Sequence, residues 1–136
     1  MNRILLYARE DGSVARTPQR QTFSIVDALI SGEGNGPEAP DAIETNLVIA
    51  GPNFAAVDLV CAKIMGFDWH RIPHLLHVFD DHDLPIVDFR YEDIVVKSEI
   101  PAYGNRRLNE INQEDCFRFR PHFGWSNFIE SRDEVH

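Results

Sequence analysis

Short apolar runs separated by turn-forming residues dominate the first half of the chain. Residues 23–30 and 46–50 are apolar, rich in β-branched side chains and of strand length, so the pattern predicts two strands. The apolar segment 3–8 is followed by the turn-forming residues 10–13, and so short a run leaves strand and helix end equally open. The polar residues 14–21 indicate a loop.

The clearest helix is predicted over residues 54–65. Asn53 is suited to cap its N-terminus and Gly66 to end it. Apolar side chains cover most of the helix circumference, so we expect it to pack on a sheet face. Asp58 is the exception on this helix. A carboxylate in apolar surroundings needs a partner, so we expect it to be partly buried and to accept hydrogen bonds from a neighbouring loop.

The remaining pattern predicts an α/β domain. Residues 69–83 form a second helical stretch with Pro73 near its first turn. Strands are possible at 86–89 and better supported at 94–96. This order of elements favours a small mixed or parallel sheet with helices packed on it. We expect a single domain of residues 1–136 whose core is formed by residues 22–100. The irregular, aromatic-rich tail 101–136 is expected to pack on the core or on a partner.

A glycine-rich segment, residues 31–37 (Ser-Gly-Glu-Gly-Asn-Gly-Pro), separates the two predicted strands. Three glycines followed by a proline favour a loop over a regular strand, and residues 37–40 prolong it. We expect a positive φ at Gly34 or Gly36. The segment matches neither the P-loop nor the dinucleotide-binding pattern. A ligand-binding loop and a plain turn both remain open.

Composition and charge limit the kinds of partner that the chain can have. The 136-residue chain has a net charge of −9, which argues against nucleic-acid binding. Cys61 and Cys116 are its two cysteines and form no Cys-x-x-Cys motif, so no iron–sulfur cluster is expected from this chain. Cys61 lies in the predicted helix and is expected to be a buried thiol. No transmembrane-length run or signal segment is evident, so we expect a cytoplasmic protein without membrane partners.

Five short motifs carry a family resemblance. They are Val26-Asp27, Glu33-Gly34-Asn35-Gly36-Pro37, Val48-Ile49-Ala50-Gly51, Ala56-Val57-Asp58 and Met65-Gly66-Phe67-Asp68. Over residues 23–73 the chain resembles domain of unknown function family 362, some members of which also carry iron–sulfur segments, and residues 117–125 are similar to the end of one subgroup. The resemblance implies an α/β fold, a ligand region at the glycine-rich segment and correspondence to the C-terminal half of longer proteins. It implies no reaction.

Three carboxylates are candidates for chemistry. If the first strand and the helix are neighbours in an α/β sheet, Glu33 lies just beyond a strand's carboxyl end, where ligands bind. Together with Asp27 or Asp58 it could hold a divalent cation or act in acid–base catalysis. Alternatively, these carboxylates only brace the glycine-rich segment. The candidate ligand-binding residues are Glu33, Gly34, Asn35, Gly36 and Asp58; no metal is expected, with Asp27, Glu33 and Asp58 as weak candidate ligands.

Two further clusters have competing interpretations. His70, His74 and His77, followed by His82, have helical spacing suited to a metal, but satisfied or exposed histidines are favoured because no Glu base accompanies them. Arg118 and Arg120 alternate with Phe117, Phe119 and Phe123. This alternation suits an anion-binding segment, yet it favours a half-buried strand with arginines outward.

Two classes of function follow. The favoured one is a non-catalytic or ligand-binding α/β domain equivalent to the C-terminal half of the larger family. The alternative is a small-molecule or divalent-metal-dependent enzyme domain with its site at residues 33–37 and Asp58. In either case we expect a homo-oligomer, or a second polypeptide supplying the missing half, because the apolar helix and an open sheet edge would favour pairing.

Overall fold

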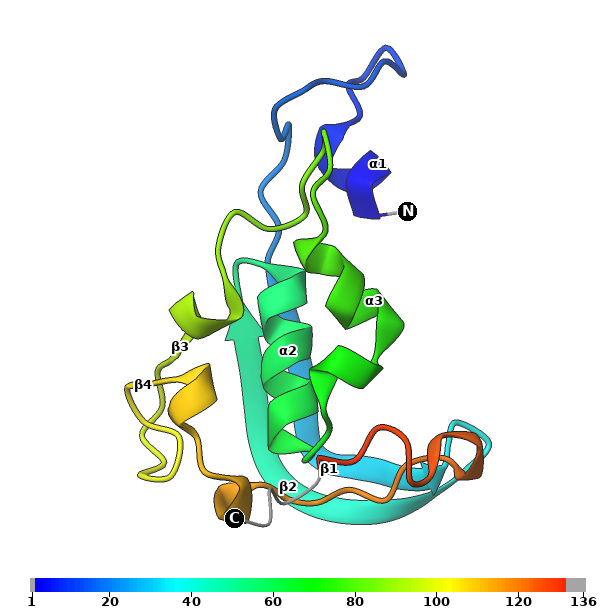
Figure 1. The fold of residues 1–136 in the computed structure, drawn as a ribbon, viewed down its shortest axis with the longest axis vertical. Coiled ribbons are helices and arrows are strands. Elements are labelled where there is room, and N and C mark those ends of the chain that lie inside the picture. The colour runs from blue at the N-terminus through cyan, green and yellow to red at the C-terminus, as the bar shows by residue number, and fades with distance from the viewer. Residues whose placement is uncertain (1, 132–136) are drawn as a thin grey trace.

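The computed structural model describes residues 2–131 and shows a long β-hairpin with helices on one face (Figure 1). Strand β1 (Ser24–Asn35) pairs with β2 (Ala39–Gly51), and helix α2 (Phe54–Ile64) packs against them. Around this unit lie α1 (Asn2–Tyr7), α3 (Pro73–Leu76) and a second sheet of β3 (Val95–Val96) and β4 (Arg106–Arg107). Single 3₁₀ turns occupy Trp69–Arg71, His77–Phe79, Tyr91–Asp93, Leu108–Glu110, Gln113–Asp115 and Phe123–Trp125.

The mixed α/β class is confirmed, but the expectation of a mixed or parallel sheet is wrong. Both two-stranded sheets are antiparallel. The physical reason is the length of the connection between β1 and β2. Only residues 36–38 join the two strands, and so short a turn can connect only antiparallel strands, since a parallel pair needs a long crossover.

The glycine-rich segment is mostly strand, contrary to the predicted loop. Residues 31–35 continue β1, and residues 39–40 already belong to β2. Pairing across the hairpin, for example between Glu33 and Asp41, supplies the ladder that overrides the weak strand propensity of glycine. The turn is confined to residues 36–38. The expected positive φ is confirmed at Gly34, where φ is +73°.

A register shift lies near the middle of the hairpin. Ala28 pairs with Leu47 and Ile30 with Glu44, which leaves one extra residue on β2. Such a bulge bends the strands, and Figure 1 shows the hairpin curving away below α2. Thr45 is buried at this bulge, where its hydroxyl donates a hydrogen bond to the carbonyl oxygen of Ala28. The bulge therefore includes a hydrogen bond between its own two strands.

Helix α2 forms as local sequence signals predict. The Ala56 N–H donates to the Asn53 side chain at 3.0 Å, which makes Asn53 the N-cap. Gly66 follows the helix with a φ of +81°. Both predicted ends are thus confirmed, and the helix packs on the inner face of β2.

The C-terminal tail covers α2 within the same chain. Leu108 and Ile111 are buried in one cluster with Leu59 of α2. Farther along, the Phe117 N–H donates to the Ile64 carbonyl and the Phe119 N–H to that of Met65. The expectation that α2 leaves an apolar face open for a partner is therefore wrong, because tail residues occupy that face.

Three other predicted elements do not form. Residues 69–83 contain only short helical turns, because Ile72 precedes Pro73 and adopts an extended conformation, with a φ of −105° and a ψ of 100°. No strand forms at 86–89, and none at 117–123. The predicted alternation nevertheless holds in part, since Phe119 is buried and Arg120 exposed.

Candidate functional site

Glu33, the central residue of the predicted site, holds the tail. Its Oε2 accepts the backbone N–H of Arg120 at 2.7 Å, and its Oε1 lies 3.5 Å from the Arg120 guanidinium. The same guanidinium pairs with Asp41 on β2. In return, the Gly34 N–H donates to the Arg120 carbonyl at 2.8 Å. These contacts support the bracing interpretation and link the hairpin tip to the tail.

Asp58 has different surroundings. Its side chain is exposed and lines a hollow shared with α1 and α3. Partial desolvation raises the pKa of this carboxyl, and nearby His74 opposes the rise. No hydrogen bond reaches it from residues 2–131, so the expected loop partner is absent there and that prediction is wrong. The physical reason is that Asp58 occupies a solvent-facing position of α2.

Asp27, the third predicted carboxylate, lies apart from Glu33 and Asp58. It is exposed on β1, where its Oδ1 accepts the N–H of Leu29 at 3.2 Å. Within the described part of the chain, no three His, Cys, Asp or Glu side chains lie close enough to hold a metal ion. The three carboxylates therefore form no common site. Ligand binding at Glu33, Gly34, Asn35 and Gly36 stays a prediction.

The histidines have ordinary local partners, as the sequence favoured. His70 Nδ1 lies 2.9 Å from Asp68, and His77 Nδ1 lies 2.8 Å from Asp80. His82 accepts the N–H of Leu84 at 2.9 Å. Because α3 ends after one turn, these rings do not share the helical face that metal binding would require.

Both thiols are poorly suited to nucleophilic chemistry. Burial and the nearby Asp58 charge raise the pKa of Cys61 to about 11. Burial likewise raises the pKa of Cys116. Cys61 is half-buried where a buried thiol was expected, and both cysteines are free. A reactive cysteine needs the opposite shift.

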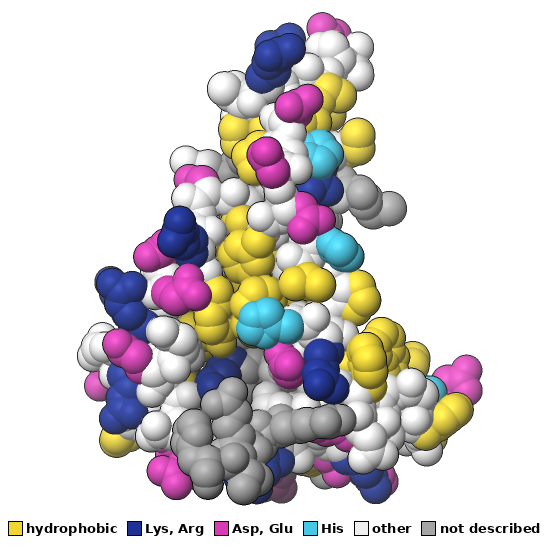
Figure 2. Space-filling view, in the orientation of Figure 1, with side chains coloured by type: hydrophobic (Ala, Val, Ile, Leu, Met, Phe, Trp, Pro, Cys, Tyr) yellow, Lys and Arg dark blue, Asp and Glu magenta, His cyan; other side chains and the backbone are white. Residues whose placement is uncertain are grey.

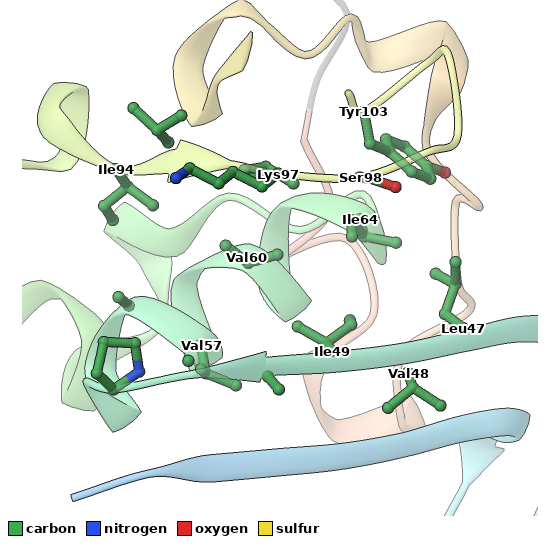
Figure 3. Close-up of a pocket in the computed structure, with 16 residues that line it drawn as sticks. Leu47, Val48, Ile49, Val57, Val60, Ile64, Ile94, Lys97, Ser98 and Tyr103 are labelled. Atoms are coloured by element: carbon green, nitrogen blue, oxygen red, sulfur yellow. The ribbon is translucent and has the colours of Figure 1, made fainter. Parts of the chain in front are cut away.

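A groove that the sequence did not reveal lies between β2, α2 and β3 (Figure 3). Its volume is about 340 Å³, within the range of small-molecule sites. Leu47 and Ile49 of β2 form one wall, and residues 94–98 form the opposite wall. Aliphatic side chains of α2 form the floor: Ala56, Val57, Val60 and Ile64.

Lys97 is the charged residue of the groove lining. Within residues 2–131 it forms no ion pair with a carboxylate. Its neighbour Ser98 accepts the Ile100 N–H at 3.0 Å, and the Tyr103 hydroxyl donates to the Asp115 carbonyl. Figure 2 shows apolar side chains gathered over the middle of the molecule on the side of α2 and α3, with charged side chains around them. The groove thus combines an apolar interior with one available cation.

Two other hollows differ from the groove in their lining or in the elements that frame them. A hollow of about 340 Å³ beneath β1 is lined by Cys61, Phe117 and Phe119 and by no basic residue. A larger one, about 750 Å³, lies between residues 16–23 and 85–88, which are mostly loops. Of its two arginines, Arg20 already donates to the carbonyls of Leu5 and Ala8, and Arg16 is exposed on a loop. The groove beside β2 is therefore the best-defined candidate site.

Fold and site together define a mixed α/β domain built on an antiparallel hairpin, with an apolar groove at one hairpin edge. Residues 5–63 match the family model described as a domain of unknown function (DUF362), so the family prediction is confirmed for this segment. The match begins and ends earlier than the predicted 23–73. It lies in the N-terminal part of this chain, and the expected correspondence to a C-terminal half has no support from it.

Comparison with curated proteins and with solved structures gave no match. Among the described residues, no helix combines the length and the hydropathy needed to cross a membrane.

Proposed function

We propose that this chain is a non-catalytic ligand-binding domain whose ligand occupies the groove between β2, α2 and β3. The observation that carries the proposal is an aliphatic cavity of about 340 Å³ whose lining includes Lys97, which forms no ion pair within residues 2–131. Apolar walls supply affinity through burial, and a few polar groups supply orientation. We assign no acid, base or nucleophile to this groove: burial raises the pKa of its Tyr103 hydroxyl, which already donates to the Asp115 carbonyl.

The ligand class follows from the same lining. Lys97 attracts an anionic group, and the aliphatic floor favours a hydrocarbon body. At about 30 Å³ for each water-sized atom, the cavity holds roughly ten non-hydrogen atoms. A medium-chain carboxylic acid of about eight carbons has this size. We therefore propose a small apolar acid as the ligand.

Calorimetric titration tests this function with straight-chain carboxylic acids from four to ten carbons and the matching primary alcohols. Affinity is expected to rise with chain length and to level off near eight carbons, where the groove is full. Lys97→Gln should weaken binding of the acids by about 5-fold to 10-fold, because a charge-assisted contact is lost. Binding of the alcohols should stay unchanged.

Lys63→Gln is the matched control, because Lys63 lies on α2 outside the groove lining. It should leave acid binding as in the unaltered protein. Ala56→Leu, which adds volume to the groove floor, should weaken acids and alcohols alike. The proposal would be contradicted if none of these compounds showed saturable binding at millimolar concentration. It would also be contradicted if the two lysine substitutions weakened acid binding equally.

A further inference from the structure

A separate hollow lies between α1, α2 and α3. In Figure 1, α3 lies beside α2 and α1 lies above both. The hollow between these helices has a volume of about 290 Å³, and we call it the helix hollow. It shares no lining residue with the groove beside β2. Binding at the two places can therefore be tested separately.

Arg3 and Asp58 bring opposite charges to the helix hollow. The Arg3 Nε donates to the Leu84 carbonyl at 3.0 Å, which anchors the guanidinium. Its terminal nitrogens form no hydrogen bond or ion pair within residues 2–131. The two side chains thus line one hollow without forming an ion pair with each other. Both charges are available to a ligand that carries the complementary pair.

Asp58 in particular lacks a partner that replaces lost water. It accepts no hydrogen bond from residues 2–131, and partial desolvation raises the pKa of its carboxyl, against the opposing effect of nearby His74. A carboxylate that is partly removed from water is stabilised by a cationic group. The other imidazole in the lining, His77, is already bonded to Asp80 through its Nδ1 at 2.8 Å.

The rest of the lining is mostly apolar. Leu75 and Val78 are buried, and Phe54 and Ile86 are half-buried. These side chains favour a hydrocarbon group, because burying it removes apolar surface from water. The helix hollow therefore combines one cation, one carboxylate and an apolar wall, the few polar groups and apolar surface that are typical of small-molecule sites.

We propose that the helix hollow binds a free α-amino acid with an aliphatic side chain of about the size of leucine. The ligand's ammonium group pairs with Asp58, and its carboxylate pairs with Arg3, whose planar guanidinium suits a carboxylate. The aliphatic side chain contacts the apolar wall. At about 30 Å³ for each water-sized atom, the hollow holds roughly ten non-hydrogen atoms, and leucine has about nine.

Chemical-shift titration of the full chain with L-leucine tests the proposal. In ¹H–¹⁵N spectra, saturable shifts at millimolar leucine should centre on residues 2–3, 54–58 and 74–78. Leucinamide lacks the carboxylate and N-acetylleucine lacks the ammonium group, so each should bind at least 5-fold more weakly than leucine, because one charge-assisted contact is lost. Saturating octanoate should leave leucine binding unchanged.

Asp58→Asn should weaken leucine binding at least 5-fold. Glu44→Gln is the matched control, because it removes an exposed carboxylate of β2 outside the lining of the helix hollow, and it should leave leucine binding unchanged. The comparison of leucine with its two analogues needs no substitution, so it keeps the proposal falsifiable if Asp58→Asn does not fold.

Four results would overturn the proposal. They are the absence of saturable shifts, shifts centred on the groove residues 47–51 and 94–98, undiminished leucine binding by folded Asp58→Asn, and equal binding of leucine and N-acetylleucine. Leucinamide that binds as tightly as leucine would also overturn it, in favour of a site for simple amines.

Discussion

Gly34 joins the hairpin tip to the tail through its backbone. Its φ is +73°, and an added Cβ would lie 3.0 Å from the Arg120 side chain. Gly34→Ala should therefore destabilise the fold by about 2 kcal/mol, through backbone strain and displacement of that guanidinium. Urea unfolding measures the change.

Gly36→Ala is the control for this effect. Gly36 has no positive φ, and its Cβ would meet Pro40 at an ordinary 3.8 Å. It should change the free energy of unfolding by less than about 1 kcal/mol. Equal losses for the two variants would show that positive φ at Gly34 is not the cause.

The thiol of Cys61 should be slow to alkylate. Its pKa rises from 9.0 to about 11 on burial, so at pH 8 the thiolate is about 100-fold scarcer than in an unfolded chain. The rate of iodoacetamide modification, followed at Cys61 by mass spectrometry, should climb until about pH 11. The protein in urea should level off near pH 9, and a native plateau near pH 9 would contradict the shift.

The same shift gives a pH dependence of stability with a definite sign. The folded state holds the Cys61 proton more tightly than the unfolded state does. Its contribution to stability is therefore complete below pH 9 and is lost as the pH rises toward about 11.

At the scale of single elements, the N-terminus of α2 is capped by one side chain, whose contribution to stability a single substitution can measure. Asn53 accepts the Ala56 N–H, and its own amide donates to the Ile86 carbonyl at 3.3 Å. Asn53→Ala should lower the free energy of unfolding by about 1 kcal/mol. Asn53→Asp retains the cap acceptor at the helix N-terminus and should lose less. If the alanine and aspartate variants lose the same free energy of unfolding, the cap does not stabilise α2.

Helix α2 and the hairpin show why some elements were predictable. The helix has its cap, its apolar residues and its terminal glycine within 14 consecutive residues of sequence, 53–66, so local pattern identifies it. The strand character of residues 31–35 depends on pairing with residues 39–43. Glycine favours a turn locally, and only that pairing outweighs the preference. The helical pattern of residues 69–83 breaks at Pro73, which keeps Ile72 before it extended.

On the scale of the whole molecule, the site could not be predicted. The groove needs β2 as a free edge, residues 94–98 opposite it and α2 as the floor. No pattern in the sequence places segments 45 residues apart side by side. Ligand binding at Glu33 stays a prediction, and its partner Arg120 lies 87 residues away, so its bracing role depends on a contact that only the fold brings about.

Chemical-shift mapping with octanoate is the most direct test of the central claim that the groove is the binding site. In ¹H–¹⁵N spectra of the full chain, saturable shifts should centre on residues 47–51, 57–64 and 94–98. They should weaken in Lys97→Gln and persist in Lys63→Gln. Shifts centred on residues 33–36, or no saturable shifts up to millimolar octanoate, would contradict the account.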